Sequence, residues 1–322
     1  MANQIITNYC NADCDFCFAS DSRSRMLKDG MRQMDEAEVR AWLDFTLRGG
    51  IKELRLLGGE PTLHPNFSDF IRLGTEAGCT VTVFSNGAMP EKALEALADL
   101  DPENCTVVVN LSARLKNDEA VRLQQRALER LGPRVTLGMT VTSAVFDFRK
   151  YAAFIDALGL EKDFRLGISN PTWGGSNTAV HPKRYPAVAQ TLLECSAMTA
   201  RHGITLSADC GFVRCMFGRN FDRLLENGFR YVSHCSPVVD LCSGGKIIPC
   251  FGLSNLISLR REDFPDAQSA CARLKEMLKP WHSFGIYPEC TECPYFETEE
   301  CSGGCLAARL KRIQRIPEKE TD

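Results

Sequence analysis

Residues 8–18 read NYCNADCDFCF and place Cys10, Cys14 and Cys17 in the spacing C-x3-C-x2-C. Three closely spaced thiolates suit an iron–sulfur cube, because each can hold one corner iron while the fourth iron stays open to a ligand from outside the protein. A zinc site or a disulfide group is the alternative, but zinc normally takes four protein ligands or an open site lined by His. The stretch therefore predicts a cluster with one open iron.

A second motif lies downstream, where residues 54–61 read LRLLGGEP. The cysteine spacing, with Phe16 just before the last cysteine, and this Gly-Gly-Glu-Pro segment together resemble the signature of the radical SAM enzymes. The resemblance implies that Cys10, Cys14 and Cys17 hold a 4Fe–4S cluster whose open iron binds S-adenosylmethionine. One electron, from a donor such as flavodoxin or ferredoxin, would cleave this cofactor to a 5'-deoxyadenosyl radical, which takes a hydrogen atom from a substrate.

The same resemblance implies which residues surround S-adenosylmethionine. Gly58 and Gly59 lack Cβ atoms and would allow close backbone approach to the ligand, and Glu60 would accept a charge-assisted hydrogen bond from the methionine ammonium. Phe16 would lie beside the cluster near the adenine, with ordinary core packing as the alternative. Further candidates follow later strands, where a turn or cap role also explains them: Ser85, Asn86, Asn110 and Ser112, with Thr140 and Thr142 as weaker ones.

Apolar segments rich in Val, Ile, Leu and Phe alternate with helix-like segments over the first two hundred or so residues, which predicts a parallel α/β sheet with strands buried on both faces. The expected strands are 4–8, 52–57, 80–84, 105–110, 135–141, 164–168 and 203–208, and the expected helices are 35–49, 65–76, 90–100, 118–131, 148–158 and 182–202, with residues 20–30 as a polar loop. The resemblance implies a partial (β/α)6 TIM-like barrel. We place its end near 205, so that 1–205 is the barrel and 206–322 a small Cys-rich, loop-rich auxiliary domain with a helical tail at 309–320.

The second part of the chain carries another cysteine group. Its spacing resembles the SPASM or twitch-like extension that holds auxiliary iron–sulfur clusters in many radical SAM enzymes. By resemblance, Cys235, Cys242, Cys250 and Cys305 would hold the cluster nearer the active site, and Cys290, Cys293 and Cys301 the outer one. One gap is longer than usual and no cysteine follows Cys305, so the outer cluster would have a non-cysteine ligand, an open iron, or be absent. A single site of Cys290, Cys293, Cys301 and Cys305, holding iron–sulfur or zinc, is the alternative.

Three more residues have no place in these motifs. Asp209 and Cys210 end the strand expected at 203–208, and Cys215 follows in the next loop. Strand ends of parallel sheets carry active sites, so these side chains are candidate catalytic residues, with a thiol as hydrogen-atom donor to a substrate radical. The alternative is that both cysteines are small core residues. The loop 171–177 is either substrate-facing or a plain connector.

Composition narrows the class of protein. A net charge of −3 indicates neither a nucleic-acid nor a membrane surface. Sixteen cysteines in a large chain with no export signal favour metal binding in a reducing compartment over disulfides, so we expect a soluble cytoplasmic protein.

The leading hypothesis for the function is modification of a peptide or protein side chain by dehydrogenation, cross-linking or epimerisation, without a leader-binding domain ahead of Cys10. A small-metabolite enzyme acting on a sugar or amino-acid derivative is the alternative, and a non-catalytic electron carrier is the third reading.

Overall fold

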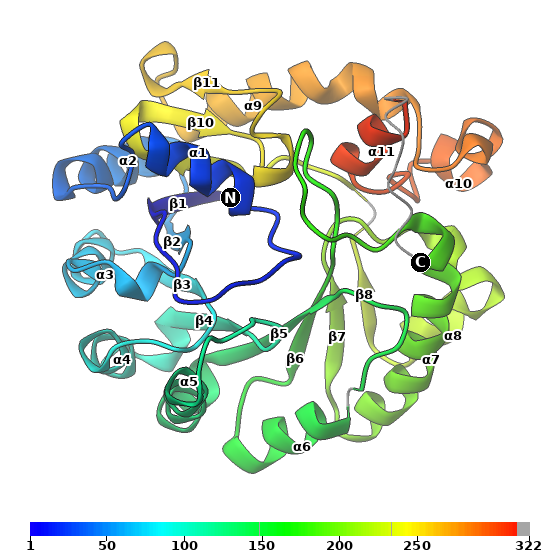
Figure 1. Ribbon diagram of the computed structural model, residues 1–322, viewed down its shortest axis with the longest axis horizontal. Coiled ribbons are helices and arrows are strands. Elements are labelled where there is room, and N and C mark those ends of the chain that lie inside the picture. Colours follow the sequence, from blue (N-terminus) through cyan, green and yellow to red (C-terminus); the bar gives the residue numbers. More distant parts are fainter. Residues whose placement is uncertain (148, 233, 314–322) are drawn as a thin grey trace.

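The computed structural model describes residues 1–147, 149–232 and 234–313. One sheet of eleven strands runs in the order β11-β10-β9-β1-β2-β3-β4-β5-β6-β7-β8 (Figure 1). The strands are β1 (Ala2–Thr7), β2 (Glu53–Gly58), β3 (Thr80–Ser85), β4 (Cys105–Asn110), β5 (Val135–Val141), β6 (Asp163–Ile168), β7 (Thr205–Ala208), β8 (Phe229–Tyr231), β9 (Val239–Cys242), β10 (Lys246–Ile248) and β11 (Leu259–Arg260). Neighbours from β1 to β8 are parallel, β9 pairs parallel to β1, and β10 and β11 are antiparallel.

Helices follow the strands, and most of them lie outside the curved sheet (Figure 1). They are α1 (Ser20–Lys28), α2 (Glu36–Arg48), α3 (Phe67–Glu76), α4 (Glu91–Ala98), α5 (Asp118–Leu131), α6 (Arg149–Leu158), α7 (Tyr185–Arg201), α8 (Phe221–Glu226), α9 (Ala267–Leu278), α10 (Pro294–Glu297) and α11 (Leu306–Ile313). The described residues form no ladder between β8 and β11, so the barrel is partial. The βα alternation predicted from the sequence is therefore confirmed.

The two faces of the sheet differ in chemistry. Leu54 and Leu56 of β2 are fully buried against the outer helices, whereas Arg55 between them turns to the inner face. The Arg55 and Arg165 guanidinium carbons each lie 4.9 Å from the centre of the Phe84 ring. Arg55 reaches Phe84 from the neighbouring strand, whereas Arg165 of β6, three strands away from β3, reaches it from across the barrel interior. The expectation of strands apolar on both faces is therefore wrong for the inner face.

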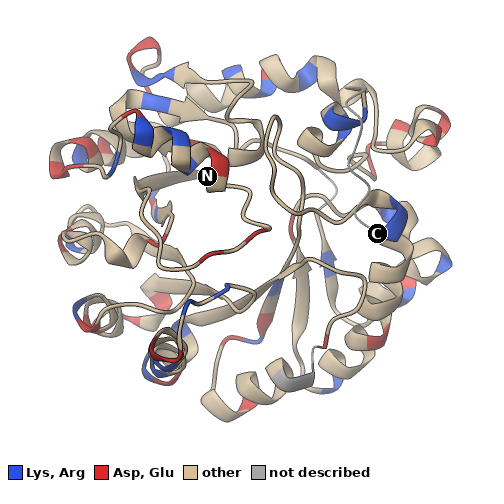
Figure 2. Cartoon of the chain, in the orientation of Figure 1, with Lys and Arg blue, Asp and Glu red and all other residues tan. Residues whose placement is uncertain are grey.

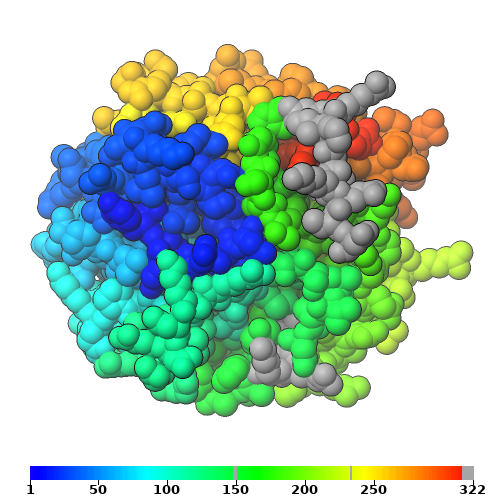
Figure 3. Space-filling view, viewed as in Figure 1, coloured from blue at the N-terminus to red at the C-terminus, as the bar shows by residue number. Residues whose placement is uncertain are grey.

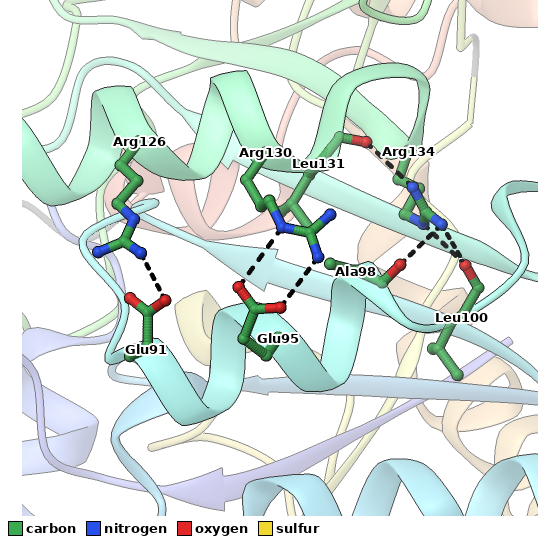
Figure 4. Close-up of polar contacts among 8 residues, drawn as sticks. All are labelled: Glu91, Glu95, Ala98, Leu100, Arg126, Arg130, Leu131 and Arg134. Atoms are coloured by element: carbon green, nitrogen blue, oxygen red, sulfur yellow. Dashed lines mark hydrogen bonds and ion pairs between the residues drawn. The ribbon is translucent and has the colours of Figure 1, made fainter.

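Outer helices are joined by polar contacts at their surfaces. Arg126 and Arg130 of α5 pair with Glu91 and Glu95 of α4 at 2.5 and 2.9 Å (Figure 4). Arg134, just after α5, donates to the carbonyl oxygens of Ala98 and Leu100. Charges of both signs are interspersed over these helices (Figure 2). Exposed ion pairs of this kind contribute about 1 kcal/mol or less each, so packing against the sheet dominates.

Three local expectations have different outcomes. The Asp35 side chain accepts from the backbone N–H of Glu38 at 2.8 Å, so the helix start predicted there is confirmed. The loop expected at 20–30 is wrong, because α1 forms there without a side-chain cap and buries Met26 against Ile5 and Phe251. Phe148, the expected start of α6, lies outside the described residues, as does the part of the tail helix after Ile313.

The sheet continues past residue 205, where the sequence places the domain boundary. Both β7 and β8 extend the barrel at one end, and β9 returns to pair with β1 at the other. The boundary stays a prediction, but the two expected units share one sheet. In the described part of the chain, no helix has the length and apolar character that a membrane crossing needs.

Candidate active site and cysteine sets

The three cysteines of the first motif lie in the loop between β1 and α1. With Ser20, Arg23 and Leu27 of α1 they line a cavity of about 180 Å³. Arg23 donates to the carbonyl oxygen of Asn8 at 3.0 Å, which holds its charge beside Cys10. Three thiols around one cavity, with a cation on its wall, fit an anionic iron–sulfur cluster that leaves one iron open.

Backbone N–H groups point at two of these sulfur atoms. The N–H of Ala12 donates to Sγ of Cys10 at 3.5 Å, and the N–H of Arg114 to Sγ of Cys14 at 3.2 Å. Burial raises the pKa of both thiols, while these hydrogen bonds lower it. Hydrogen bonds to ligating sulfur tune the reduction potential of a cluster. The loop after β4 therefore belongs to this site through Arg114, a residue that the sequence analysis did not single out.

The two glycines of the second motif serve a backbone contact. A Cβ at Gly58 would lie 2.3 Å from the carbonyl oxygen of Thr7, and one at Gly59 would lie 2.1 Å from that of Tyr9. The N–H groups of Gly59 and Glu60 donate to these two oxygens, each at 2.8 Å. Only residues without a Cβ fit this close approach. In the structure the glycines thus dock the end of β2 against the cysteine loop, and ligand approach there stays a prediction.

Glu60 is fully buried and its carboxylate is hydrogen-bonded to neighbouring turns. Oε1 accepts from Oγ1 of Thr62 at 2.7 Å and Oγ of Ser85 at 2.8 Å, and also from the Thr62 N–H at 3.2 Å. Oε2 accepts from the N–H of Asn86 at 2.7 Å. Burial raises the pKa of Glu60, whereas these donors lower it. One acceptor position on Oε2 remains for the predicted ammonium contact.

Asn86 joins the turn after β3 to the cysteine loop. Its Nδ2 donates to Oδ1 of Asn11 at 2.7 Å, and Nδ2 of Asn11 donates to the carbonyl oxygen of Ala88 at 2.8 Å. Gln124 of α5 donates to the Asn86 carbonyl oxygen at 2.6 Å. Asn86 thus positions the loop that carries Cys10, and a direct cofactor contact is untested.

The candidates at the ends of β4 and β5 form one network. Asn110 donates from Nδ2 to Oγ1 of Thr140 at 3.1 Å and accepts from the N–H of Ser112 at 2.9 Å. The hydroxyl of Ser112 bridges the carbonyl oxygen and N–H of Thr140 at 3.1 and 2.9 Å. Thr142 lies beyond the strand and is exposed. The network explains Asn110 and Ser112 as turn residues, and their cofactor role stays a prediction.

The loop after β6 crosses the barrel mouth and covers the cysteine loop. Asn177 donates from Nδ2 to the carbonyl oxygen of Phe16 at 3.3 Å, and the N–H of Thr178 donates to that of Asp15 at 2.9 Å. On its other side the N–H of Trp173 donates to the carbonyl oxygen of Gly252 at 2.9 Å. Figure 3 shows this green segment against the blue N-terminal surface. Phe16 is buried beneath it, and the loop connects the first cysteine motif to the segment after Cys250.

Four cysteines from distant segments form what we call the inner set: Cys210, Cys235, Cys250 and Cys305. Cys210 keeps an exposed surface, yet the protein atoms around it desolvate the thiol and raise its pKa well above the ordinary value, and the thiols of Cys235 and Cys305 raise it further. Burial and the thiols of Cys305, Cys235 and Cys210 do the same for Cys250. The first turn of α11 contacts the set, because backbone N–H groups of Ala307 and Ala308 donate to Cys305 and that of Leu306 to Cys235.

Four others form the outer set: Cys215, Cys290, Cys293 and Cys301. Burial and then the thiols of Cys301, Cys290 and Cys293 raise the pKa of Cys215 to about 11. The hydroxyl of Tyr231 lies 3.7 Å from Sγ of Cys301. In the described residues no three His, Cys, Asp or Glu side chains are grouped closely enough to hold a single metal ion. Ligands of a cube need not converge in that way, because each thiolate binds its own iron.

Cys242 belongs to neither set, so its expected place among the inner ligands is wrong. It is fully buried in an apolar cluster with Ile5, Met26 and Phe251, and its sulfur faces the carbonyl oxygen of Asp240 at 3.9 Å. Cys242 pairs with Lys246 across the β9–β10 hairpin, while Cys250 lies beyond the hairpin's other end. Burial and then Asp240 raise the pKa of Cys242, and no thiol of the inner set contributes to that rise.

Asp209 lies at the barrel interior and is already paired. Both of its carboxylate oxygens accept from Nε of Arg165, at 2.8 and 2.9 Å.

The sequence analysis did not identify Arg55 and Arg165 as residues of the barrel interior. A signal was present, since β2 begins Glu-Leu-Arg-Leu and β6 begins Asp-Phe-Arg-Leu, each with a charged residue at alternate positions. Period-two polarity of this kind marks a strand with one polar face.

Comparison with known proteins identifies the class. Residues 5–134 match the family model described as the Radical SAM superfamily. The matched residues contain the cysteine loop and the first four strands of the barrel, so this part of the chain is a radical SAM domain, and members of the superfamily use S-adenosylmethionine and 4Fe–4S clusters.

Individual relatives are more distant. GTP 3',8-cyclase of Chlorobaculum tepidum is 26% identical over 133 residues, which is 39% of this chain and 39% of the cyclase. The tungsten-containing aldehyde ferredoxin oxidoreductase cofactor-modifying protein of Pyrococcus furiosus is 33% identical over 100 residues, 30% of this chain and 26% of that protein. The alignments thus span about two fifths or less of these two relatives.

Solved structures share the fold over more of the chain. Streptococcus suis SuiB superposes with a TM-score of 0.70 at 14% identity, covering 96% of this chain and 73% of SuiB. The anSMEcpe structure with bound AdoMet and Kp18Cys peptide gives 0.67 at 17% identity, covering 99% of this chain and 91% of anSMEcpe. At these identities the likeness shows a common fold alone, and it extends through the cysteine-rich second part.

Proposed function

We propose that this radical SAM enzyme oxidises a peptide or protein side chain, by dehydrogenation or cross-linking. The observation that carries the proposal is the adjacency of Asp209 and Cys210. Asp209 lies at the barrel interior with Arg165, and the next residue belongs to the inner set. Consecutive Cα atoms are about 3.8 Å apart. A substrate in the barrel would therefore lie beside the inner set, close enough to lose an electron to a group held there.

The reaction balances as a two-electron oxidation of the substrate. When bound, S-adenosylmethionine and the first cluster supply the radical that abstracts one hydrogen atom. The substrate then loses one electron towards the inner set and one proton to water. The electron passes on to a one-electron carrier of the flavodoxin or ferredoxin class. Epimerisation, which returns a hydrogen atom, is less well supported, because the candidate thiol donors lie within the two cysteine sets.

Support for a peptide substrate comes from the solved neighbours. SuiB has been crystallised with its precursor peptide SuiA, and anSMEcpe with Kp18Cys and Cp18Cys peptides. Their likeness covers 96–99% of this chain, including the second cysteine group. The curated relatives align over 39% of the chain or less in the two cases described above. We further propose a cytoplasmic location, since a reducing compartment preserves thiolate-bound iron.

A small-metabolite substrate is the second candidate. The cyclase likeness favours it, as do Arg55 and Arg165 on the Phe84 ring, because an aromatic ring flanked by cations could receive a planar anionic molecule. Glu53 and Asp209 already pair with these arginines, so little positive charge is free for an anion.

The test uses the anaerobically reconstituted full chain with S-adenosylmethionine and dithionite. Short peptides encoded beside the gene are compared with GTP as substrates, and 5'-deoxyadenosine and product masses are measured. The proposal expects a peptide product lighter by about two hydrogen atoms, and deuterium transfer from a labelled peptide to 5'-deoxyadenosine. Conversion of GTP with no peptide turnover would overturn it in favour of the second candidate.

A further inference from the structure

We propose that Cys210 and Cys215 are the fourth thiolate ligands of two auxiliary 4Fe–4S clusters, Cys210 completing the inner set and Cys215 the outer set. The inference rests on the radical SAM function only for the kind of group that the thiols hold. It replaces the catalytic role first considered for these cysteines, and it supplies the outer ligand that the spacing after Cys305 lacks.

Two short segments carry the argument, because each contributes one cysteine to each set. Four residues separate Cys210 from Cys215, and three separate Cys301 from Cys305. The two segments contact one another, since a Cβ on Gly304, the residue before Cys305, would be 3.3 Å from a methyl group of Val213. Each segment thus reaches from the inner set to the outer set. Residues 210–215 supply the fourth cysteine of both sets.

Contacts outside the thiols fix the Cys215 end of this segment. Arg214, its neighbour, forms an ion pair with Glu300, which precedes Cys301. The Arg214 guanidinium carbon also lies 3.9 Å from the centre of the Tyr295 ring, two residues after Cys293. The Arg214 side chain thus holds the backbone of Cys215 against the two segments that carry Cys293 and Cys301.

The Cys210 end is held from the barrel. Asp209 is fixed by Arg165, and its N–H donates to the carbonyl oxygen of Leu166 at 2.7 Å. Gly211 follows with a φ of 107°, and a Cβ there would lie 2.4 Å from Nδ2 of Asn170. A residue with positive φ that packs this closely must be glycine. At this tight turn the thiol of Cys210 lies near those of Cys235 and Cys305, with Asp209 and Arg165 also beside it.

Charge around the sets matches two anionic clusters. Arg309 is fully buried, and it donates to the carbonyl oxygens of Gly304, Phe284 and Ser302. Among the described residues no carboxylate pairs with it, while cysteines of both sets, Cys235, Cys305, Cys301 and Cys290, are its electrostatic neighbours. A buried cation needs a compensating anion. A cube with four thiolates carries net negative charge, and the N-terminal N–H groups of α11 add favourable donors.

Complete ligation has a chemical consequence. A cluster with four thiolates has no open iron, so it can transfer electrons but cannot bind a substrate directly. A ligating thiolate also carries no S–H bond to give to a radical. Both auxiliary clusters would therefore act as electron carriers, the inner one beside the barrel and the outer one further from it.

The test measures iron and acid-labile sulfide in the full chain on a Cys10→Ala, Cys14→Ala, Cys17→Ala background, which removes the first cluster. We expect about eight irons per chain in this background, from two cubes. Adding Cys210→Ala or Cys215→Ala should remove about four, or leave a cube that loses one iron on mild oxidation and gives a three-iron signal by electron paramagnetic resonance. Cys242→Ala and Cys79→Ala, which change buried cysteines outside both sets, are the matched controls.

Each outcome decides the proposal. Retention of about eight irons without a three-iron signal in the Cys210 and Cys215 variants would overturn it. So would loss of a cluster in Cys242→Ala, provided that circular dichroism shows a folded chain. Stoichiometric zinc in place of iron in the background variant would assign the thiols to structural metal. None of these readouts depends on substrate turnover, so failure here is distinct from failure of the proposed peptide oxidation.

Discussion

Nδ2 of Asn86 donates to Oδ1 of Asn11 at 2.7 Å, a contact between the turn after β3 and the loop that carries the first three cysteines. Replacing Asn86 with Asp removes this donor and places a carboxylate beside the Asn11 oxygen. A buried acceptor without its donor costs about 1–3 kcal/mol. We expect Asn86→Asp to lower the thermal midpoint and to speed iron release from the first cluster to a chelator. Asn104→Asp, at an exposed position, is the control, and equal iron release in the two variants would contradict the positioning role.

Gly59→Ala tests the docking of β2 against the cysteine loop. The new methyl group would lie 2.1 Å from the carbonyl oxygen of Tyr9, so the backbone must move. Overpacking of this kind costs about 1–3 kcal/mol. We expect a lower thermal midpoint and selective loss of the first cluster, measured as iron in a chain that keeps its auxiliary cysteines. Gly167→Ala, whose Cβ would meet nothing nearer than 3.9 Å, should leave both quantities unchanged.

His64 should make the folding stability of the protein decrease as the pH falls. It is buried, its Nε2 lies 2.9 Å from the Met34 carbonyl oxygen, and burial lowers its pKa. Below about pH 6.5 the unfolded chain therefore binds a proton that the folded chain does not, and stability falls as pH falls. We expect the drop in thermal midpoint between pH 7.5 and 5.5 to be smaller in His64→Gln than in the parent. An equal drop would show that His64 does not contribute.

Arg309 should set the reduction potentials of the auxiliary clusters. Arg309→Met keeps most of the apolar stem and removes the buried positive charge beside both sets. Adding an electron to a cluster becomes harder without that charge, so both potentials should shift to more negative values in redox titrations followed by electron paramagnetic resonance. Arg312→Met, on the exposed side of α11, is the matched control. Unchanged potentials in Arg309→Met with full iron content would separate Arg309 from the clusters.

The sequence predicted the structure best where the residues that share a role lie close together along the chain. The first cysteine motif needs only eight consecutive residues, and the βα alternation repeats often enough to define the barrel. It failed for α1, which has no side-chain cap and is stabilised by the packing of Met26. It also failed to distinguish Cys242 from Cys210, because that choice depends on which side chains pack around each cysteine rather than on spacing. The similar separations of Cys210–Cys215 and Cys301–Cys305 were the available signal.

The pairing of β1 with β9 bears on how the protein is made. Asn3 of β1 donates to Asp240 of β9 at 2.7 Å, across 237 positions of sequence. During synthesis one edge of the first strand stays without its partner until β9 has been made, and an open parallel edge invites pairing with other chains. The first cysteine loop leaves this strand directly, so a cluster inserted before β9 has been made would enter an incomplete barrel. A ribosome-bound chain ending before Val239 should therefore aggregate more readily than one that includes β9 and β10.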